Sequence, residues 1–444
     1  MKLGHVYLWQ PDPGHLLEGR VARAVVPLPH LEEPDEAPPR LRGRFVRVRN
    51  AGFVNAPDPA SGTVHAAAIG DAAPDEAGDF LFEPGRGGGR LDKAEHADPD
   101  LVGRYVQASH FGEVNTYFHL DLVASFVDDL LRELGAPSLP PVVAVVNAHH
   151  AVTTRPDGTR DGVRRGERWL PFQGGHYRLP ARRYDVCEHE PLAVTGEIHL
   201  GPGWRLTDHG GLVETAGGRY RANASHNAGI LYHEYGHHLT RHTADFRGNA
   251  LRREDRQDNR KTAMDEGTCD YWAAALLGTP HIWAWHRRHD REETHPRSLA
   301  SKKTMADFDH GPGADPHANG TIWSAALWDL RARLGAEGPP GRRRADLLVL
   351  RGLLLIGGTG GGTTARAARA SRRGFSVGLA ALFHADEVDH AGRHRDVILD
   401  VFARRGILPG MRDGGRGPTF AGASSGGDVG SGLLGLVDGG CHHD

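Results

Sequence analysis

The spacing of apolar residues changes along the chain, and this change limits the folds that the sequence can adopt. Residues 1 to about 105 alternate short β-like runs, such as Val21 to Val26 and Phe45 to Val48, with turns rich in Pro and Gly. From about residue 226 onward, apolar residues recur every three or four positions, which is the period of an amphipathic helix. Strands that precede a series of helices predict an α+β protein.

The same periodicity predicts the individual elements. The first long helix is expected at Glu113 to Leu134, because its apolar residues recur at three- and four-residue steps and Gly135 ends the pattern. A strand is expected at Pro141 to Val146, and residues 192 to 200 predict another strand at an exposed edge of the sheet. Further helices are expected at His226 to His242, Ala263 to Leu277, Gly320 to Leu334, Ala345 to Leu355, Thr364 to Arg372 and His394 to Arg405.

Composition excludes several classes of protein. The 444 residues carry 53 Lys and Arg against 56 Asp and Glu, and a chain without a basic excess is not expected to bind nucleic acid. No run approaches the roughly 18 apolar residues of a membrane span. Three cysteines cannot form a disulfide framework. Residues 1 to 7 lack the apolar core of a secretory signal, and composition does not choose a cellular location.

One short motif points to metal chemistry. His233-Glu-Tyr-Gly-His237 places two imidazoles four residues apart, which is one turn of a helix, so both can bind the same Zn²⁺. Glu234 lies beside them, where a carboxylate can reach a water bound to the metal. In a chain with 29 histidines the pattern should arise by chance about 0.1 times, so a third ligand is needed to support it.

The third ligand is predicted to be Glu266. A histidine six positions after the second motif His would be one alternative, but Thr243 occupies that position. Glu266 follows His237 by 29 residues, on the next expected helix, and Asp270 lies four residues further on the same face. One carboxylate can therefore bind the metal while the other accepts the N–H of a ligating imidazole.

These residues resemble a known family. His233–His237 followed by Met264–Asp270 is similar to the fungalysin group of secreted zinc endopeptidases, which are gluzincins related to thermolysin. The family's second motif usually reads Gly-Glu-Gly-Trp-Ser-Asp, and here Asp265 replaces its first Gly while Thr-Cys replaces Trp-Ser. The resemblance covers about residues 105 to 410, through three more segments in consistent order: Val114–His119, His317–Trp328 and Val401–Gly406.

The resemblance implies a domain organisation. A thermolysin-like peptidase would have a β-containing N-terminal catalytic lobe with the zinc-binding helix, expected at 106–242, and a helical C-terminal lobe, expected at 243–410. A β-rich region, 1–105, would precede them, and a Gly-rich tail, 411–444, would follow. The resemblance also implies an extracellular protein.

The expected chemistry is peptide-bond hydrolysis. His233, His237 and Glu266 would bind Zn²⁺ and leave a fourth position to water, as in catalytic sites. Glu234 would act as general base, and Asp270 would orient a ligating imidazole. The resemblance implies that His317 helps to hold the oxyanion. The expected substrates are polypeptides, which could pair with the strand at 192–200 by β-strand addition.

Two other functions remain open. An aminopeptidase could use the same ligands, but it normally needs a Gly-x-Met-Glu-Asn segment upstream, and none is found. A non-catalytic binding or scaffold protein could retain the zinc fold, although such a protein has no use for Glu234. The sequence gives neither the cleavage preference nor the oligomeric state, nor whether a propeptide is removed.

Four further motifs carry weaker signals. The glycine run Gly357–Gly362 resembles a phosphate loop but lacks its lysine. Cys187–His189 and Cys441–His443 have no partners at zinc spacing. The acidic loop Asp307–Asp315 offers oxygen ligands, and because relatives commonly bind Ca²⁺, calcium is a possible second cation here.

Overall fold

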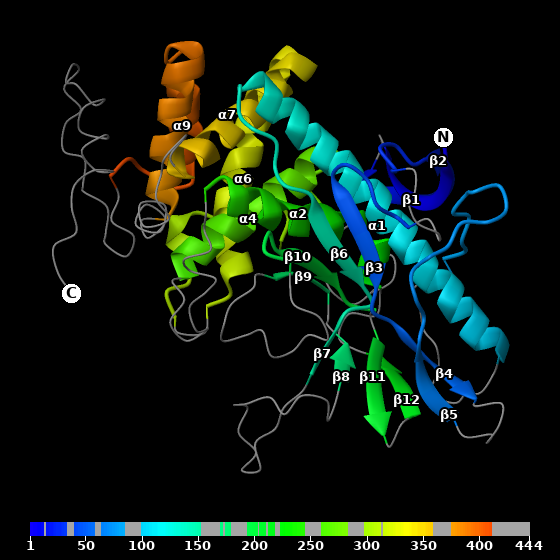
Figure 1. The fold of residues 1–444 in the computed structure, drawn as a ribbon. Coiled ribbons are helices and arrows are strands. Elements are labelled where there is room, and N and C mark those ends of the chain that lie inside the picture. Colours follow the sequence, from blue (N-terminus) through cyan, green and yellow to red (C-terminus); the bar gives the residue numbers. More distant parts are fainter. Residues whose placement is uncertain are drawn as a thin grey trace, which may run out of the picture.

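The structure is a computed structural model with a mixed α+β fold. It describes residues 1–12, 15–32, 40–57, 64–84, 99–151, 169–171, 174–178, 193–202, 204–209, 212–217, 223–244, 259–282, 297–311, 314–357 and 374–410. Helices dominate these residues, and Figure 1 shows them on one side of a small central sheet, with short β-hairpins on the other side. The predicted fold class is confirmed at this level.

The central sheet has four strands in the order β3 (Val46–Asn50), β6 (Val142–Val146), β10 (Glu197–Leu200) and β9 (Gly175–Arg178). β6 pairs in parallel with β3 and with β10, whereas β9 runs antiparallel to β10. β9 is therefore an outer strand of this sheet, within the part of the chain that the structure describes.

The prediction of an edge strand at 192–200 is wrong. β10 lies between β6 and β9, and all four of its residues are buried. The alternation of polar Glu197 and His199 with Ile198 and Leu200 suggested one solvent-facing side. Those two polar side chains are instead paired with each other, with 2.8 Å between His199 Nε2 and Glu197 Oε2, and Arg49 of β3 binds the same carboxylate oxygen at 3.0 Å. Burial is tolerated here because the charges neutralise one another.

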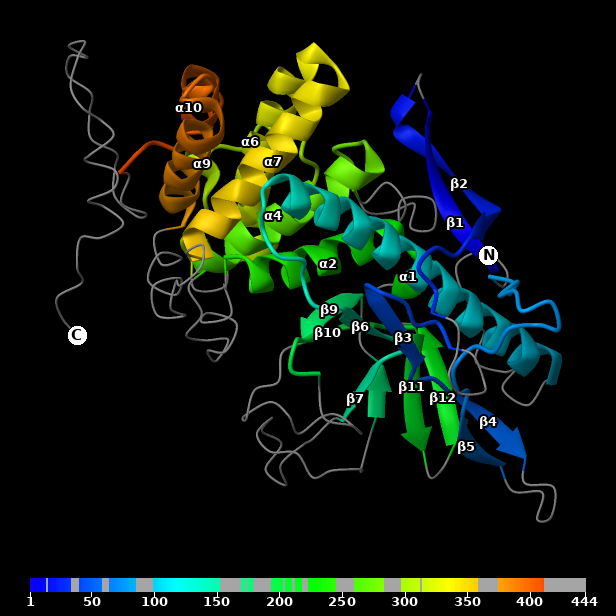
Figure 2. The same cartoon turned by 45° about the horizontal axis from the view of Figure 1, so that its top comes forward.

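Four hairpins complete the β-structure. Two of them lie in the predicted β-rich region, 1–105, and two lie beyond it. They are β1 (Leu3–Asp12) with β2 (His15–Pro27), β4 (Phe53–Pro57) with β5 (Val64–Ala68), β7 (His149–Ala151) with β8 (Trp169–Pro171), and β11 (Trp204–His209) with β12 (Leu212–Gly217). Figure 2 shows β1 and β2 as a long ribbon beside α1, away from the other hairpins.

The first helix, α1 (Pro99–Glu133), crosses the central sheet. It begins well before the predicted start at Glu113, so the expected boundary at residue 105 falls inside it. Its apolar stripe is fully buried, and Gly135 ends the helical segment in a left-handed conformation with φ of 65°. The buried stripe includes Phe111, Val114, Tyr117, Leu120, Val123, Val127 and Leu130.

Six more α-helices follow in the described part of the chain; four of them were predicted within four residues of their ends, and a fifth, α7, begins six residues before its predicted start. They are α2 (Ala228–His242), α4 (Asn259–Leu277), α6 (Pro316–Leu334), α7 (Pro339–Gly357) and α10 (Arg395–Arg404), while α9 (Phe375–His390) was not predicted. The helix expected at 364–372 and the tail 411–444 lie outside the described residues. Short 3-10 turns occur at Ala224–His226, Met305–Asp307 and Gly335–Glu337. None of the described helices is long and apolar enough to span a lipid bilayer.

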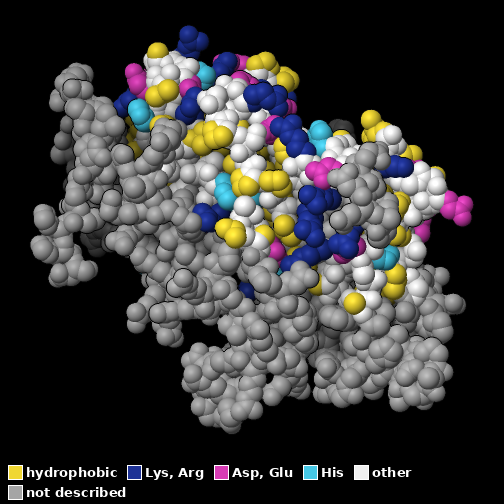
Figure 3. Space-filling model, viewed as in Figure 1, with side chains coloured by type: hydrophobic (Ala, Val, Ile, Leu, Met, Phe, Trp, Pro, Cys, Tyr) yellow, Lys and Arg dark blue, Asp and Glu magenta, His cyan; other side chains and the backbone are white. Residues whose placement is uncertain are grey.

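Basic side chains gather over β3 and the segment before it (Figure 3). Most of the arginines there are paired with carboxylates: Arg40 with Asp71, Arg42 with Glu32, Arg44 with Asp128 and Arg49 with Glu197. The local positive charge is therefore largely neutralised, which gives no support to a phosphate-binding surface at this place.

Close contacts between glycines bring three helices together at the centre of the molecule. Gly236 of α2 lies against the backbone of Cys269 in α4, where an added Cβ would meet the Cys269 Cα at 2.7 Å. A Cβ on Gly267 of α4 would overlap the carbonyl of Gly320 in α6. We call this contact of α2, α4 and α6 the helix crossing, and the candidate site lies in it.

Candidate metal centre

Helix α2 carries the first two site histidines. Asn227 caps its start, because the side-chain oxygen accepts hydrogen bonds from Gly229 N and Ile230 N. His233 and His237 lie one turn apart, with their ring centroids 5.0 Å from each other. The predicted helix and the predicted pairing of the two imidazoles are both present.

Helices α4 and α6 supply the other groups. Glu266 lies in α4, next to the glycine that lets α4 approach α6. His317 lies in the first turn of α6, where Asp315 is the N-cap and Pro316 occupies the first helical position. The two helices therefore bring residues 51 positions apart to the same point.

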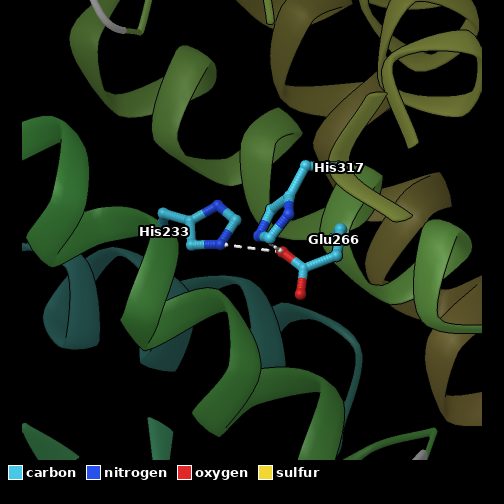
Figure 4. Close-up of side chains that lie close together, drawn as sticks. All are labelled: His233, Glu266 and His317. Carbon is cyan, nitrogen blue, oxygen red and sulfur yellow. Dashed lines mark ion pairs between the residues drawn. The ribbon is translucent and has the colours of Figure 1, made fainter. Parts of the chain in front are cut away.

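The three imidazoles surround one carboxylate oxygen. Oε2 of Glu266 lies 3.1 Å from His233 Nε2, 3.2 Å from His317 Nε2 and 3.6 Å from His237 Nε2. Figure 4 shows Glu266, His233 and His317 pointing toward one another from three different helices. The ligand atoms of these three residues lie within 4.8 Å of each other, a spacing at which one ion could bind to all of them.

Each imidazole is held on its other side by an aspartate. His233 Nδ1 lies 2.8 Å from Asp270 Oδ1, His237 Nδ1 lies 3.3 Å from Asp265 Oδ2, and His317 Nδ1 lies 2.9 Å from Asp315 Oδ1. A carboxylate accepts, so Nδ1 of each ring carries the donated proton. The neutral ring then has a lone pair at Nε2, and all three lone pairs face Glu266.

This arrangement fits a bound cation. Oε2 of Glu266 is buried, and among the described residues no donor reaches it with hydrogen-bond geometry. Three neutral rings would turn their lone pairs toward this oxygen and repel it, so the centre requires positive charge, supplied by a bound cation or by protons on the rings. Imidazole nitrogens with a carboxylate oxygen form a donor set that Zn²⁺ accepts.

The pKa values of the site residues also indicate that this centre favours positive charge. Although burial opposes its charged form, His317 and His237 hold the pKa of Glu266 well below the ordinary value. The Glu266 carboxylate raises the pKa of His317 to about 10. Burial lowers the pKa of His233, but its hydrogen bond with Asp270 and the nearby Glu266 carboxylate outweigh this effect and raise it.

Arg297 completes the support of His233. Its guanidinium donates to Asp270 Oδ1 at 2.6 Å and to Asp270 Oδ2 at 3.3 Å. Burial opposes the charged form of Asp270, but the Arg297 charge and the bond from His233 keep its pKa below the ordinary value. Asp270 therefore stays ionised and can fix the His233 ring.

Asp265 supports His237 in the same way. Its Oδ1 accepts a hydrogen bond from Thr240 Oγ1 at 2.6 Å, which fixes the carboxylate that binds the ring. The buried thiol of Cys269 lies 3.8 Å from the same oxygen, and His237, Asp265 and Cys269 form a second group with metal-ligand spacing. The two groups have no residue in common, but His237 Nε2 lies 3.6 Å from Glu266 Oε2 of the first group, so we treat them as one centre.

Glu234 lies beside this centre, under the outer strand. Its side chain is buried and contacts Gly175 of β9, where an added Cβ would stand 2.7 Å from Glu234 Cγ and 2.8 Å from Glu234 Oε1. The candidate base is thus at the border between the helix crossing and the strand β9.

Sequence reasoning found most of this site but missed three residues. The structure brings together the predicted His233, His237, Glu266, Asp270 and His317. Asp265 was treated as a departure from the family motif, although its place before the ligand carboxylate was a usable signal. The Asp-Pro-His sequence at 315–317 is typical of a helix start and could have identified Asp315. Arg297 has no local signal, because only the folded chain brings it to Asp270.

The remaining motifs gain no support. In the acidic loop, Asp309 accepts from Gly311 N, Asp315 accepts from His317 N, and Asp307 caps the turn after Thr304. These carboxylates serve the local backbone, and no metal-ligand group is found among the described residues of this loop. Residues 187–189, 441–443 and 358–364 lie outside the described part of the chain.

No protein-family model matches this chain, and no curated protein matches its sequence. The resemblance to fungalysins therefore rests on the motif residues alone.

Proposed function

We propose that this protein is a zinc-dependent endopeptidase of the thermolysin and fungalysin type, with catalytic lobes at 106–242 and 243–410. The observation that carries the proposal is the convergence of three Nε2 atoms on the buried Oε2 of Glu266, each ring being held by its own aspartate. A structural site would need only the ligands, whereas here a further buried carboxylate, Glu234, follows His233 in the same helix.

His233, His237 and Glu266 would hold the zinc ion. When bound, zinc lowers the pKa of water to about 7 and polarises a carbonyl group. The side chain of His317 is 39% exposed, against 5% for His233, so His317 lies on the side that substrate can reach. We therefore assign to His317 the stabilisation of the oxyanion and not a fourth ligand position. Because Asp315 takes the Nδ1 proton, donation from Nε2 requires the protonated ring, which the pKa of about 10 favours.

Glu234 would act as the general base. Its carboxylate accepts a proton from the attacking water and then passes it to the leaving amine. Its burial under β9 shields it from bulk solvent, which strengthens its interactions with the reacting groups. Asp270 and Asp265 would keep the rings of His233 and His237 in the tautomer that presents Nε2 to the metal, and Asp315 would orient the protonated ring of His317.

The substrate strand would pair with β9. β9 is one of the two outer strands of the described sheet, and it contacts Glu234 through Gly175, so an extended peptide added to it would run past the base. This assignment replaces the earlier expectation for 192–200. Recognition through main-chain hydrogen bonds suits an enzyme that acts on unfolded polypeptides.

One experiment tests the proposal. Zinc content and casein hydrolysis are measured for the wild type and for Glu234→Gln. We expect about one zinc per chain in both proteins and a loss of several orders of magnitude in casein hydrolysis in the variant alone. Equal activity in the two proteins would falsify the assigned base.

The same assay separates the alternatives. Cleavage of an amino-acid anilide without cleavage of casein would identify an aminopeptidase. A zinc-containing wild type that cleaves neither substrate would identify a binding or scaffold protein. A second cation, calcium at residues 307–315, would appear as an additional bound metal in the same elemental analysis.

A further inference from the structure

Tyr177 ties the outer strand β9 to its two neighbours. Its hydroxyl lies 2.7 Å from the carbonyl oxygen of Thr195, in the turn before β10. The same hydroxyl lies 3.2 Å from Nδ1 of His238, a fully buried residue of α2. One phenol thus connects β9 with both the adjacent strand and the helix that carries the predicted zinc ligands.

The hydrogen bonds of His238 show which ring nitrogen faces Tyr177 as an acceptor. Its Nε2 lies 2.9 Å from the carbonyl oxygen of Pro140, which can only accept, so the ring donates through Nε2. Nδ1 of the neutral ring is then an acceptor, so the single Tyr177 hydroxyl proton is shared between the Thr195 carbonyl oxygen, at 2.7 Å, and this nitrogen, at 3.2 Å. Because Pro140 precedes β6, the chain Tyr177–His238–Pro140 spans from the outer strand to the middle of the sheet.

The backbone leaves room for this hydroxyl. Gly196 has a φ of 94°, in the left-handed region that side chains avoid, and a Cβ there would overlap the Tyr177 hydroxyl. A glycine is therefore needed at this place for two independent reasons. We call Tyr177, His238 and the Thr195 carbonyl the Tyr177 anchor.

The anchor acts on the candidate active site through the strand itself. Side chains alternate along a strand, so Gly175 and Tyr177 point to the same face of β9. Gly175 lies against Ile230 and Glu234 of α2, and Tyr177 binds His238, two helical turns beyond Ile230. Two contacts on one helix fix both the position and the register of β9 relative to Glu234.

We propose that Tyr177 and His238 are positioning residues, which hold β9 against α2 so that an extended peptide bound to β9 lies at a fixed distance from Glu234. The inference rests on the proposed peptidase function. It adds two residues that contact neither the substrate nor the ligand atoms. They fix the position of β9, the proposed substrate-binding strand, relative to α2.

The test compares two tyrosines of the full-length protein, the half-buried Tyr177 and the buried Tyr232. Tyr177→Phe removes the anchoring hydroxyl. Tyr232→Phe is the matched control, because the Tyr232 hydroxyl makes a similar buried bond, 2.7 Å to His119 Nδ1, on the α1 side of the same helix. The readouts are amide hydrogen exchange of residues 174–178 and, separately, KM and kcat for an extended peptide.

We expect a change in Tyr177→Phe alone. The loss of one hydrogen bond corresponds to roughly a 5- to 10-fold effect, so exchange of the β9 amides should accelerate and KM should rise by about that factor. We expect kcat to change less than about 2-fold, because the base and the ligands are untouched. Equal changes in both variants, or none in the β9 exchange of Tyr177→Phe, would overturn the proposal.

A pair of substitutions at His238 sharpens the test. His238→Asn keeps a polar atom near the Nδ1 position, whereas His238→Gln reaches toward the Pro140 carbonyl and loses the partner of Tyr177. We expect the Asn variant to lie closer to the wild type in β9 exchange and KM, and the Gln variant to resemble Tyr177→Phe. The reverse order would contradict the anchor.

The outcomes also separate this inference from the proposed function. If the wild type cleaves no peptide while β9 exchange still accelerates only in Tyr177→Phe, the peptidase proposal fails and the anchoring stands. If the wild type cleaves peptides and Tyr177→Phe matches it in exchange and KM, the anchoring fails and the peptidase proposal stands.

Discussion

Two buried histidines show how differently the two halves of this molecule are built. His119 of α1 accepts from the Tyr232 hydroxyl at Nδ1 and donates through Nε2 to the Tyr7 carbonyl, at 2.7 and 2.8 Å. His233 of α2 has carboxylates on both sides, Asp270 at 2.8 Å and Glu266 at 3.1 Å. Burial lowers the pKa of His119 to about 4, whereas the two carboxylates raise the pKa of His233.

This difference between His119 and His233 indicates what the α1 side and the helix crossing each contribute. The α1 layer, which we define as α1 with the sheet and hairpin that it covers, buries mainly apolar side chains, and its buried carboxylates Glu197 and Asp128 are each paired with an arginine. The helix crossing buries charges and brings backbones into contact through glycines. Buried charge contributes little to stability, so its presence there fits a site that binds a cation.

Among the substitutions considered, Glu266→Gln is expected to have the largest effect, a loss of zinc affinity. The change removes the anion that faces three imidazoles, and one of several ligands accounts for about 4 kcal/mol of a typical zinc-binding free energy, or about a 1,000-fold loss of affinity. Competition with a chelator measures this loss.

The matched control lies in the α1 layer. Glu113 is also buried, and it accepts from Asn50 Nδ2 and Ala72 N at 2.8 and 2.9 Å. Glu113→Gln should lower the free energy of unfolding by about 1–3 kcal/mol and leave zinc affinity unchanged. Similar zinc affinities in the two variants would remove the distinction between the regions.

His317→Ala tests whether this histidine acts on substrate or binds the metal. Loss of an oxyanion donor should lower kcat by about 100- to 1,000-fold, while zinc affinity changes only a few-fold. Steady-state kinetics and chelator competition on the same preparation give both numbers. A fall in zinc affinity comparable to that of Glu266→Gln would instead make His317 a ligand.

The pH dependence of stability should show the neutral histidine of the α1 layer. Between pH 6.5 and 4 the unfolded chain protonates His119 and the folded protein does not, so the free energy of unfolding falls by about 1.4 kcal/mol for each pH unit lost. Relative to His119→Gln, the wild type should lose about 3 kcal/mol over this range and show no further trend above pH 6.5 or below pH 4. Urea unfolding at several pH values measures the difference, and a constant difference would show that His119 is not held neutral.

Two glycine substitutions should change the free energy of unfolding in opposite directions. Gly267→Ala in the helix crossing pushes α4 away from the Gly320 carbonyl and should cost about 1–3 kcal/mol, with weaker zinc binding. Gly103→Ala in α1, where an added Cβ meets nothing within 4 Å, should stabilise the protein by about 0.5–1 kcal/mol. Thermal unfolding measures both changes, and the same sign in the two variants would contradict the close approach of α4 and α6.

The fold was predictable where one apolar face recurs at a single period. Helix α2 has such a pattern and was predicted within a few residues. α4 and α6 were also predicted within a few residues, although they are buried on most sides. α9 is buried almost throughout its first half, Phe375 to Phe383, and was not predicted. β10 was placed at an edge because Glu197 and His199 suggested solvent, and pairing between distant residues such as Arg49 and Glu197 is not visible in a local pattern.

The residues of the candidate site were also predictable only in part. His233, His237 and Glu266 were predicted because helix geometry fixes their local spacing. Arg297 and Tyr177 act through contacts with residues 27 and 61 positions away, which only the folded chain creates.

Diffraction at the zinc absorption edge, from crystals of the protein grown with zinc, tests the central claim most directly. The account predicts one strong anomalous peak at about 2.0–2.2 Å from His233 Nε2, His237 Nε2 and an oxygen of Glu266. A peak elsewhere, or no peak at these side chains under conditions that fully load the protein with zinc, would contradict it.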